Sequence, residues 1–441
     1  MKVTSLTLNQ MRGIEQAEFQ FQPGMNLIVG VNGAGKSSVL DALRVTLSRM
    51  LPRLTSVKMR QESFSASDIT NGRGSLTVQM QIALGGQTLE QLIHLPRERY
   101  AETEQSGEVR DQTYGLEPRD ELTLHPPDGA PLRVEAKKDL AAHVKIKKAT
   151  PLAIYFAARR SLYSEAAGSQ SARSGGGPTF AFADALRPRE LRIREFTSWW
   201  RVQEEIGSPE RLEALREAVL TFLDDFSDVR VTDESEPTMV LRKGQRTLGV
   251  SQLSDGERGM LSLVLDVARR LSLANPTLAD PLREGQAVIL IDEIDLHLHP
   301  RWQRSVVGRL AATFPQCQFI ATTHSPFVIQ SLKPGQLINL DPESDEEGYA
   351  EDYADKSIED ISEDVMGIEL PQKSQRYLDM MKTAEEYYRI VHKAKGAPSE
   401  EREALKHRLD ELSIPYSDDA AFTAFLKFQR ESALREDETD Q

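Results

Sequence analysis

The sequence predicts an α/β fold: a mixed sheet with flanking helices, extended by a helical lobe and a helical C-terminal tail. Ala287–Ile291 is continuously apolar and Met25–Val29 is apolar apart from Asn26, which is typical of short strands buried on both faces of a sheet. Residues 75–95 alternate between apolar and polar side chains, which indicates antiparallel strands. From Gln372 onward the apolar residues recur at helical spacing, which predicts the helical tail.

Four segments are expected along the 441 residues. The first (1–160) is an N-terminal lobe with a glycine-rich loop and antiparallel strands, and the second (161–248) is a helical lobe with a mobile Gly/Ser-rich loop at Ala167–Pro178. The third (249–340) carries a Ser-Asp-Gly sequence, a strand that ends in carboxylates, and a histidine. The fourth (341–441) is an acidic segment followed by the tail, which is a candidate docking region for a partner.

The individual elements follow from local patterns. A strand, a turn and a second strand precede Met25, and a helix follows the glycine-rich loop from Ser38 to Met50. The remaining expected elements are a turn at Pro126–Gly129, a buried strand at Leu152–Ala157, helical structure from Phe182 to Phe226, two strands between Val229 and Leu248 around the Lys243-Gly244 turn, a strand at Cys317–Thr322, and helices at Gln372–Lys395, Glu400–Leu412 and Asp419–Glu436.

Composition limits the classes of protein that the chain can belong to. No apolar stretch approaches the roughly 18 to 20 residues that span a bilayer, and the N-terminus lacks an apolar signal core, so a cytoplasmic protein with no membrane contact is expected. The lone Cys317 excludes an internal disulfide and is expected to be a packed core thiol. The adjacent Trp199 and Trp200 are likewise expected in the core rather than as a platform for bases.

The formal net charge of −14 is concentrated in one segment. Asp341 to Asp364 holds twelve acidic residues and one lysine, and the rest of the chain is close to neutral. The charge therefore neither forbids a nucleic-acid partner nor supplies a basic footprint for one. We expect the acidic run to be a solvated, mobile segment rather than a docking patch.

The glycine-rich loop has the pattern G-x-x-x-x-G-K-S between a strand and a helix. Its glycines let backbone N–H groups turn toward phosphate oxygens, and the following helix N-terminus adds its positive dipole. Lys36 is expected between the β- and γ-phosphates, and the Ser37 hydroxyl is placed for Mg²⁺.

The apolar strand Ala287–Ile291 ends in Asp292 and Glu293. Because ligands of parallel α/β sheets lie at the carboxyl ends of the strands, Asp292 is the expected Mg²⁺ partner and Glu293 the expected base for an attacking water. The next strand ends at Thr323-His324, from which His324 can reach the γ-phosphate. His297 and His299 invite a metal site, but no cysteine or third histidine lies nearby in the sequence, so a structural or subunit-contact role is favoured.

These motifs, together with Leu253-Ser254-Asp255-Gly256-Glu257-Arg258, resemble those of the AAA-15/AAA-21 group of ABC-type P-loop ATPases, relatives of the OLD, RecF and SMC/Rad50 proteins. The chain is similar to the PtuA ATPase subunit of Septu and retron-associated anti-phage systems, in which the partner is a separate HNH nuclease. The resemblance implies an ABC-type head that hydrolyses ATP with Mg²⁺ and pairs with a second copy around the nucleotide, as a dimer or a higher oligomer.

The resemblance also assigns residues by position. Ser254, Asp255 and Gly256 would contact the γ-phosphate held by the opposite subunit. Asp295 falls in the loop that touches that subunit. Asp68 is a substitute for a glutamine that related proteins place on Mg²⁺. Nucleotide would be bound by a set of loop and flanking residues: Arg12, Gly30, Asn32, Gly33, Ala34, Gly35, Lys36, Ser37 and Ser38.

Departures from the family pattern leave alternatives open. Asp255 and Glu257 replace the more usual Gly and Gln, so the rate of hydrolysis is open. The spacing of 217 positions from Lys36 to Leu253 is too long for a transporter ATPase and too short for an SMC coiled-coil arm. No TOPRIM or HNH pattern follows His324, so a nuclease would be another polypeptide. The remaining hypotheses are a defence ATPase that controls a partner nuclease and reaches DNA through that complex, a RecF-like ATPase that clamps DNA without a nuclease, and a stand-alone NTPase switch.

Overall fold

The computed structural model divides the chain into two units, Met1–Gly367 and Ile368–Gln441. It describes residues 1–55, 57–97, 117–127, 129–140, 150–158, 178–189, 193–206, 209–232, 238–340, 353–368, 374–393 and 400–414. The predicted Gly/Ser-rich loop up to residue 177 and the predicted last helix at 419–436 lie outside these ranges. Among the described residues, no helix is long and apolar enough to cross a membrane.

An antiparallel sheet forms one wall of the first unit. Its strand order is β2-β1-β4-β5-β6-β7, with every neighbouring pair antiparallel. The strands are β1 (Lys2–Met11), β2 (Ile14–Gln20), β4 (Ser75–Leu84), β5 (Gln87–Pro96), β6 (Arg119–His125) and β7 (Leu132–Arg133), and a short helix α2 (Lys137–Leu140) follows. The alternation over 75–95 is thus confirmed as the β4–β5 hairpin.

A parallel sheet forms the centre of the unit and contains the two apolar strands predicted from the sequence. Its order is β14 (Leu337–Asn339), β3 (Met25–Val29), β13 (Gln318–Thr322), β12 (Ala287–Ile291) and β8 (Leu152–Phe156). All four neighbouring pairs are parallel, and each residue of β3, β8, β12 and β13 is buried. Only the three-residue β14 was not predicted.

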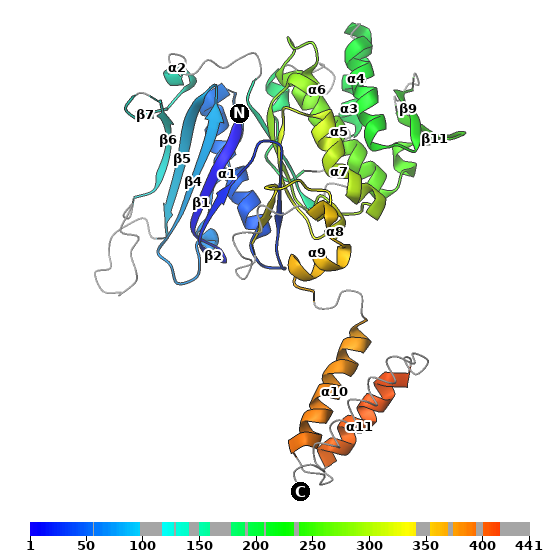
Figure 1. Ribbon diagram of the computed structural model, residues 1–441. Coiled ribbons are helices and arrows are strands. Elements are labelled where there is room, and N and C mark those ends of the chain that lie inside the picture. The colour runs from blue at the N-terminus through cyan, green and yellow to red at the C-terminus, as the bar shows by residue number, and fades with distance from the viewer. Residues whose placement is uncertain are drawn as a thin grey trace. The chain divides into compact units, whose positions relative to one another are not determined.

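Helix α1 (Lys36–Thr55) lies between the two sheets (Figure 1). Apolar residues on several sides of it, including Val39, Leu40 and Ala42, share one core with Val78 of the antiparallel sheet and Val288 of the parallel sheet. A helix buried on opposite sides needs apolar residues nearly all round, and α1 has them. The phosphate-loop helix is therefore fixed between two walls.

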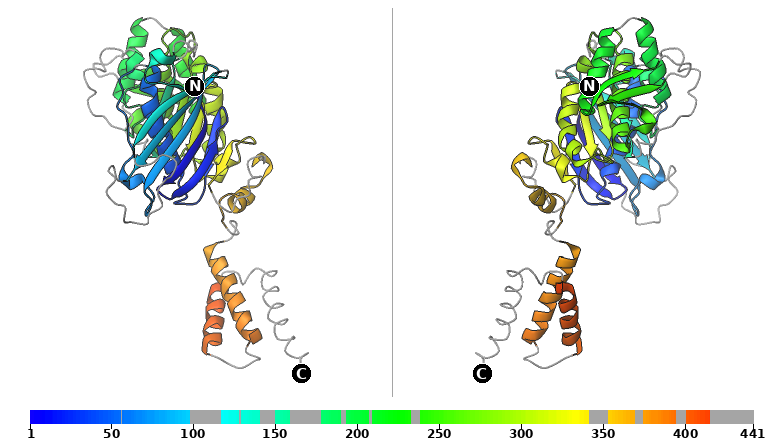
Figure 2. Two further views of the ribbon diagram at one scale, coloured as in Figure 1. Left: turned by 90° about the vertical axis from the view of Figure 1, so that its left-hand side faces the viewer. Right: turned by 90° about the vertical axis from the view of Figure 1, so that its right-hand side faces the viewer.

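Further helices cover the other face of the parallel sheet, which Figure 2 shows opposite the antiparallel sheet. They are α3 (Ile193–Ile206), α4 (Pro209–Phe222), α5 (Asp255–Ala274), α6 (Pro281–Glu284) and α7 (Pro300–Thr313). Trp199 and Trp200 are buried in this layer, and the Trp200 indole donates to Glu204 at 2.9 Å, so their prediction as core residues is confirmed. Cys317 is buried as well, and burial raises the pKa of its thiol to about 12.

Two predicted boundaries in this region are wrong. The helical stretch ends at Phe222, because Phe226 begins a strand, β9 (Phe226–Val231), that pairs with β10 (Met239–Lys243). With β11 (Arg246–Gly249) this makes a three-stranded sheet, where two strands were expected. The predicted turn at Lys243-Gly244 does join β10 to β11.

The prediction that the whole acidic run is a mobile, solvated segment is also wrong for its second half. A helix, α9 (Ile358–Asp364), lies within the run and packs near α8 (Pro326–Ile329). Ser357 caps α9 with a reciprocal capping box to Asp360, and Ile361 is fully buried in the core of the first unit. Apolar residues at helical spacing therefore dock this segment despite its charge.

The described part of the second unit contains two helices, α10 (Gln375–Lys393) and α11 (Glu400–Ser413), as the tail pattern predicted. Met380 and Ala384 on α10 pack with Leu409 on α11, and Tyr377 and Leu412 flank this small core. Arg376 also donates to the Glu411 carbonyl at 2.9 Å. So small a core leaves most of the surface of the two helices outside it.

Candidate nucleotide-binding site

The glycine-rich loop joins β3 to α1 in the arrangement that cradles phosphates. Gly30, Gly33 and Gly35 have φ angles of 146°, 89° and 105°, which side-chain-bearing residues rarely adopt. A Cβ on Gly35 would also come within 2.9 Å of Ile14 Cδ1. Asn32 and Gly33 are exposed, Ala34 is half-buried, and Ser37 is exposed at the start of α1 while Ser38 is buried. The loop and helix N-terminus are thus shaped to present backbone N–H groups to an anion.

Lys36 lies folded against this loop. Its Nζ donates to the carbonyls of Gly30 at 2.7 Å and Val31 at 3.0 Å. Burial lowers the pKa of Lys36 from its ordinary value, and the negative charges of Asp292 and Glu293 work in the opposite direction. The lysine is therefore close enough to both carboxylates to feel their charge.

The carboxyl ends of three neighbouring strands bring the predicted residues together. In the parallel sheet, β13 lies between β3 and β12, so the phosphate loop, the Thr323-His324 pair and Asp292-Glu293 all leave the same edge. The three groups of predicted site residues therefore follow neighbouring strands of one sheet.

Thr322, the last residue of β13, ties this edge together and was missed by the sequence reasoning. Its hydroxyl donates to Asp292 Oδ1 at 2.7 Å and accepts the Glu293 backbone N–H at 2.8 Å. Glu293 has a φ of 49°, a left-handed conformation that is costly for a glutamate and needs such support. The only sequence signal is the position of Thr322 at the end of the strand next to Asp292.

Asp295 is held by the end of the same neighbouring strand. Its Oδ1 accepts the Thr323 hydroxyl at 2.5 Å and the His324 backbone N–H at 3.4 Å. His324 itself is exposed, so its ring is accessible from solvent. The structure therefore brings Asp295 and His324 together, with the carboxylate supporting the backbone from which the histidine projects.

His297 and His299 lie in the turn that leads into helix α7. His299 caps helix α7, where its Nδ1 accepts the Arg301 N–H at 3.3 Å, and His297 has a φ of 62°. Within the described ranges, no group of three or more His, Cys, Asp or Glu side chains could hold a metal. The capping contact agrees with the structural role that was favoured for this pair.

Helix α5 begins at the Ser-Asp-Gly sequence, whose first two residues are exposed. Ser254 is the N-cap, and its side chain forms a reciprocal capping box with Glu257. Gly256 faces the His297 backbone so closely that a Cβ there would lie 2.4 Å from the His297 carbonyl oxygen. The glycine thus lets the helix N-terminus pack against the segment that follows Glu293.

Arg12 and Asp68, which were predicted to serve the nucleotide and Mg²⁺, are paired with each other. The Arg12 guanidinium lies 2.9 Å from Asp68 and 2.9 Å from Asp41 of α1, and Arg12 has a φ of 53°. Burial works to raise the pKa of Asp68, but hydrogen bonds from Ser65 and the Arg12 charge outweigh it and hold that pKa below its usual value. A metal ion would have to compete with these donors for the Asp68 carboxylate.

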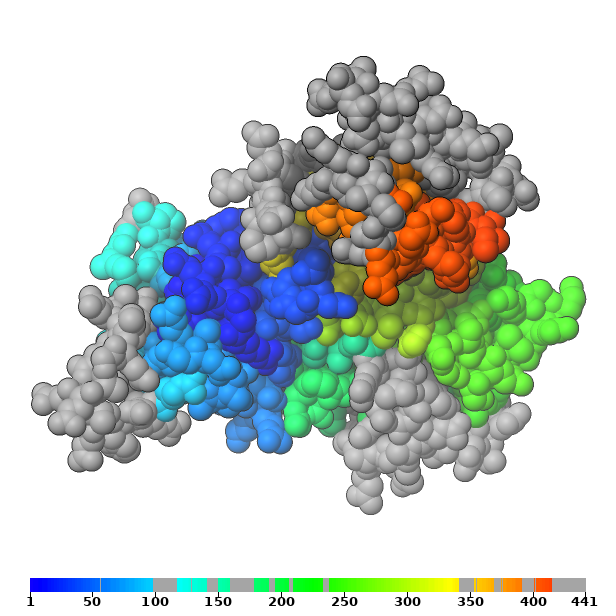
Figure 3. Space-filling view, turned by 90° about the horizontal axis from the view of Figure 1, so that it is seen from below, coloured from blue at the N-terminus to red at the C-terminus, as the bar shows by residue number. Residues whose placement is uncertain are grey.

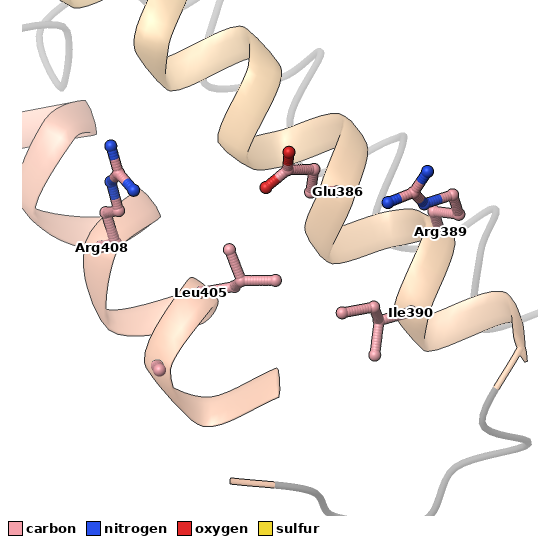
Figure 4. Close-up of a pocket in the computed structure, with 6 residues that line it drawn as sticks. Glu386, Arg389, Ile390, Leu405 and Arg408 are labelled. Carbon is pink, nitrogen blue, oxygen red and sulfur yellow. The ribbon is translucent and has the colours of Figure 1, made fainter. Parts of the chain in front are cut away.

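A pocket in the second unit lies outside this constellation. Its walls are Glu386, Arg389 and Ile390 of α10 and Ala404, Leu405 and Arg408 of α11 (Figure 4). Three of the lining residues are charged, with both signs present, and three are aliphatic, and none of the six belongs to a nucleotide motif.

In the first unit, the N-terminal strands and the β4–β5 hairpin form a continuous surface, which is blue in Figure 3.

Two family models match the chain and together cover both halves of this site. The model described as "AAA domain" (AAA_23) matches residues 5–163, which include the phosphate loop. The model described as "AAA domain, putative AbiEii toxin, Type IV TA system" (AAA_21) matches residues 153–330, which include Ser254, Asp292 and His324.

Individual relatives agree with the family models. The retron Ec83 probable ATPase of Escherichia coli is 26% identical over 381 residues, covering 75% of this chain and 70% of that protein. The Septu protein PtuA of Bacillus mycoides is 30% identical over 179 residues, and the DNA replication and repair protein RecF of Psychromonas ingrahamii is 36% identical over 94 residues. These two matches cover 37% and 20% of this chain and only 24% and 26% of the relatives' own lengths.

Among solved structures, the SMC head domain from Thermotoga maritima superposes with a TM-score of 0.41 at 16% identity, covering 77% of this chain and 94% of that one. The family models, the loop geometry and the strand ends agree on nucleotide binding. The chain thus contains AAA_23 and AAA_21 ATPase domains, and its homologues include the retron Ec83 probable ATPase and the Septu protein PtuA.

Proposed function

We propose that this ATPase is the ATP-hydrolysing subunit of a cytoplasmic anti-phage defence complex, in which two copies pair around ATP and control a separate HNH-type nuclease. The defence assignment is supported by the retron ATPase match, which extends over three quarters of the chain. The observation that carries the pairing is the exposure of Ser254 and Asp255 at the N-terminus of α5. That N-terminus is open to a ligand held by another molecule.

The chemistry assigned to each residue follows from its place at the edge of the parallel sheet. The loop from Gly30 to Lys36 would bind the phosphates, and Glu293 would take the proton of the attacking water. The Ser37 hydroxyl and the Asp292 carboxylate are the hard oxygen donors that suit Mg²⁺, and they begin α1 and follow β12. When bound, Mg²⁺ would neutralise charge on the phosphate oxygens. His324 would contact the γ-phosphate from the end of β13.

Pairing is tested with Glu293→Gln, which should retain ATP and slow turnover. The expected result is a stable dimer, or a higher oligomer, that forms only with ATP and Mg²⁺ and is resolved by sedimentation velocity. Lys36→Ala in the same background should abolish both ATP binding and pairing. A Glu293→Gln protein that turns ATP over at the unchanged rate would remove the assignment of Glu293 as the base.

Nuclease docking is assigned to the tail, because α10 and α11 form a unit with its own core. A chain that ends at Gly367 should bind ATP normally and lose its nuclease in a co-purification from cells that express both genes. A full-length chain with Lys36→Ala is the control, since it leaves the tail intact. Co-purification of the nuclease at full strength with the shortened chain would place the docking surface elsewhere.

A RecF-like ATPase that clamps DNA without a nuclease is the second candidate, and the RecF match favours it. This function predicts that the purified protein alone retards duplex DNA in an ATP-dependent manner that weakens steeply with salt. The defence function predicts DNA binding only through the assembled complex. ATP turnover that responds to neither DNA nor nuclease would instead favour a stand-alone NTPase switch.

A further inference from the structure

Lys243 pairs with the carboxylate of Glu257, the residue that follows the Ser-Asp-Gly sequence. Lys243 is the last residue of β10, and its Nζ lies 2.7 Å from Glu257 Oε1 on helix α5. The ammonium also lies 5.0 Å from the centre of the Phe226 ring, which limits where it can go. The hydrogen bond to Glu257 raises the pKa of Lys243. The β10–β11 hairpin is thereby tied by charge to the start of α5.

Glu257 transmits this contact to Ser254 through its second oxygen. Oε2 accepts the Ser254 backbone N–H at 2.8 Å and the Ser254 hydroxyl at 2.9 Å, and the hydroxyl accepts the Glu257 N–H at 3.3 Å. Burial works to raise the pKa of Glu257, but Lys243 and Ser254 outweigh it and keep that pKa below its ordinary value. Both carboxylate oxygens are thus engaged, one by the hairpin and one by the helix cap.

The positive charge of Lys243 offsets the negative charge of Glu257 at the N-terminus of α5. An anionic phosphate that approaches Ser254 meets the carboxylates of Asp255 and Glu257, which would repel it if they were unpaired. Asp255 is paired with Arg258 from its own helix. Glu257 has its cation supplied by a different element, so the position of the hairpin decides whether that charge is neutralised.

We propose that Lys243 is a positioning residue for the ATPase reaction. It neutralises and orients Glu257, and through Glu257 it fixes the Ser254 cap and lowers the negative charge that the γ-phosphate held by a second copy would meet at the N-terminus of α5. This inference rests on the pairing proposed above. Lys243 pairs with Glu257 and, at 3.6 Å, with Asp225, and neither belongs to the phosphate loop. Its replacement should therefore impair pairing without weakening the subunit's own hold on ATP.

The test compares variants in the Glu293→Gln background. Lys243→Met removes the charge and keeps the aliphatic stem, and Lys243→Arg keeps the charge. Arg242→Met is the matched control, because it removes a cation from the exposed neighbouring position of the same strand. ATP affinity is measured with a fluorescent ATP analogue on dilute protein, and ATP-dependent self-association is measured by sedimentation velocity.

Lys243→Met should weaken self-association about tenfold and leave ATP affinity within about twofold, because the lost pairing of Glu257 acts on the partner's phosphate. Lys243→Arg should recover most of the association, and Arg242→Met should match the parent. In the protein that keeps Glu293, and so can hydrolyse ATP, Lys243→Met should lower turnover most at low protein concentration. A role confined to folding would not be relieved by raising the protein concentration.

Two results would overturn the inference in different ways. If the parent pairs with ATP and Lys243→Met pairs as well as Arg242→Met, the inference alone is wrong. If the parent does not pair with ATP, the proposed pairing is wrong and this inference falls with it. Thermal unfolding of each variant is recorded in parallel, and Lys243→Gln replaces the Met variant should that protein fail to fold.

Discussion

Gly256 gives the sharpest test of how α5 is seated, because its surroundings leave no room for a methyl group. A Cβ at this position would lie 2.4 Å from the His297 carbonyl oxygen and 3.4 Å from the His297 carbonyl carbon. Both are backbone atoms, which cannot swing aside as a flexible side chain would. Gly256→Ala must therefore displace either the first turn of α5 or the segment after Glu293.

The cost is of the order of overpacking a filled interior, about 1 to 3 kcal/mol in the free energy of unfolding. Gly308 of α7 is the matched control, because a Cβ there would meet nothing within 4 Å. Gly308→Ala in a helix interior should instead stabilise the protein by about 0.5 to 1 kcal/mol. The two identical chemical changes should thus have opposite signs.

Denaturant unfolding of both variants, followed by tryptophan fluorescence, measures the difference. Gly256→Ala should also weaken ATP-dependent pairing, since it shifts the N-terminus of α5, while it leaves the phosphate loop intact. A Gly256→Ala protein as stable as Gly308→Ala would show that the close approach to His297 is absent, and would refute the reasoning.

Three further outcomes are expected. Lys36→Ala should reduce ATP binding below detection in equilibrium dialysis, because the ammonium donates within the loop and has no substitute there; binding within tenfold of the parent would contradict this. Thr322→Val keeps the size of the side chain but removes the hydroxyl that bonds Asp292 and the Glu293 N–H. Turnover and the response to Mg²⁺ should therefore fall about 10- to 100-fold while ATP affinity is unchanged. Thr313→Val at the end of α7 is its control. Burial raises the pKa of Cys317 to about 12, so the thiol should stay protonated and unlabelled by iodoacetamide from pH 7 to 9 in the folded protein, and rapid labelling without unfolding would contradict its burial.

The strand ends that form the site could be predicted because continuous apolar runs identify parallel strands wherever they occur. Met25–Val29, with four apolar residues, and Ala287–Ile291, with five, needed no tertiary information, since such runs are typical of strands buried on both faces. The order of the strands places β13 between them, and that order depends on crossovers that no local pattern encodes.

Contacts between distant side chains were not predictable for the same reason. Arg12 and Asp68 were given separate roles, but they are 56 residues apart and meet only because β1 and the turn after Phe64 are neighbours in space. Thr322 looked like an ordinary strand residue until its hydroxyl was seen between Asp292 and Glu293. By contrast, helix α9 had a readable signal in its Ser357 capping box and buried Ile361, which the charge of the acidic run obscured.

The position of α1 between the two sheets has a consequence for how the first unit melts. Leu43 and Leu47 on this helix belong to one apolar cluster with residues of both sheets, so neither sheet can separate while the other keeps its contacts. Heating should therefore give a single cooperative transition for Met1–Gly367, in which the antiparallel and parallel sheets lose amide protection together. A nucleotide bound at the start of α1 would raise the temperature of that whole transition, and the amides of β4, remote from the phosphates in sequence, would report its presence.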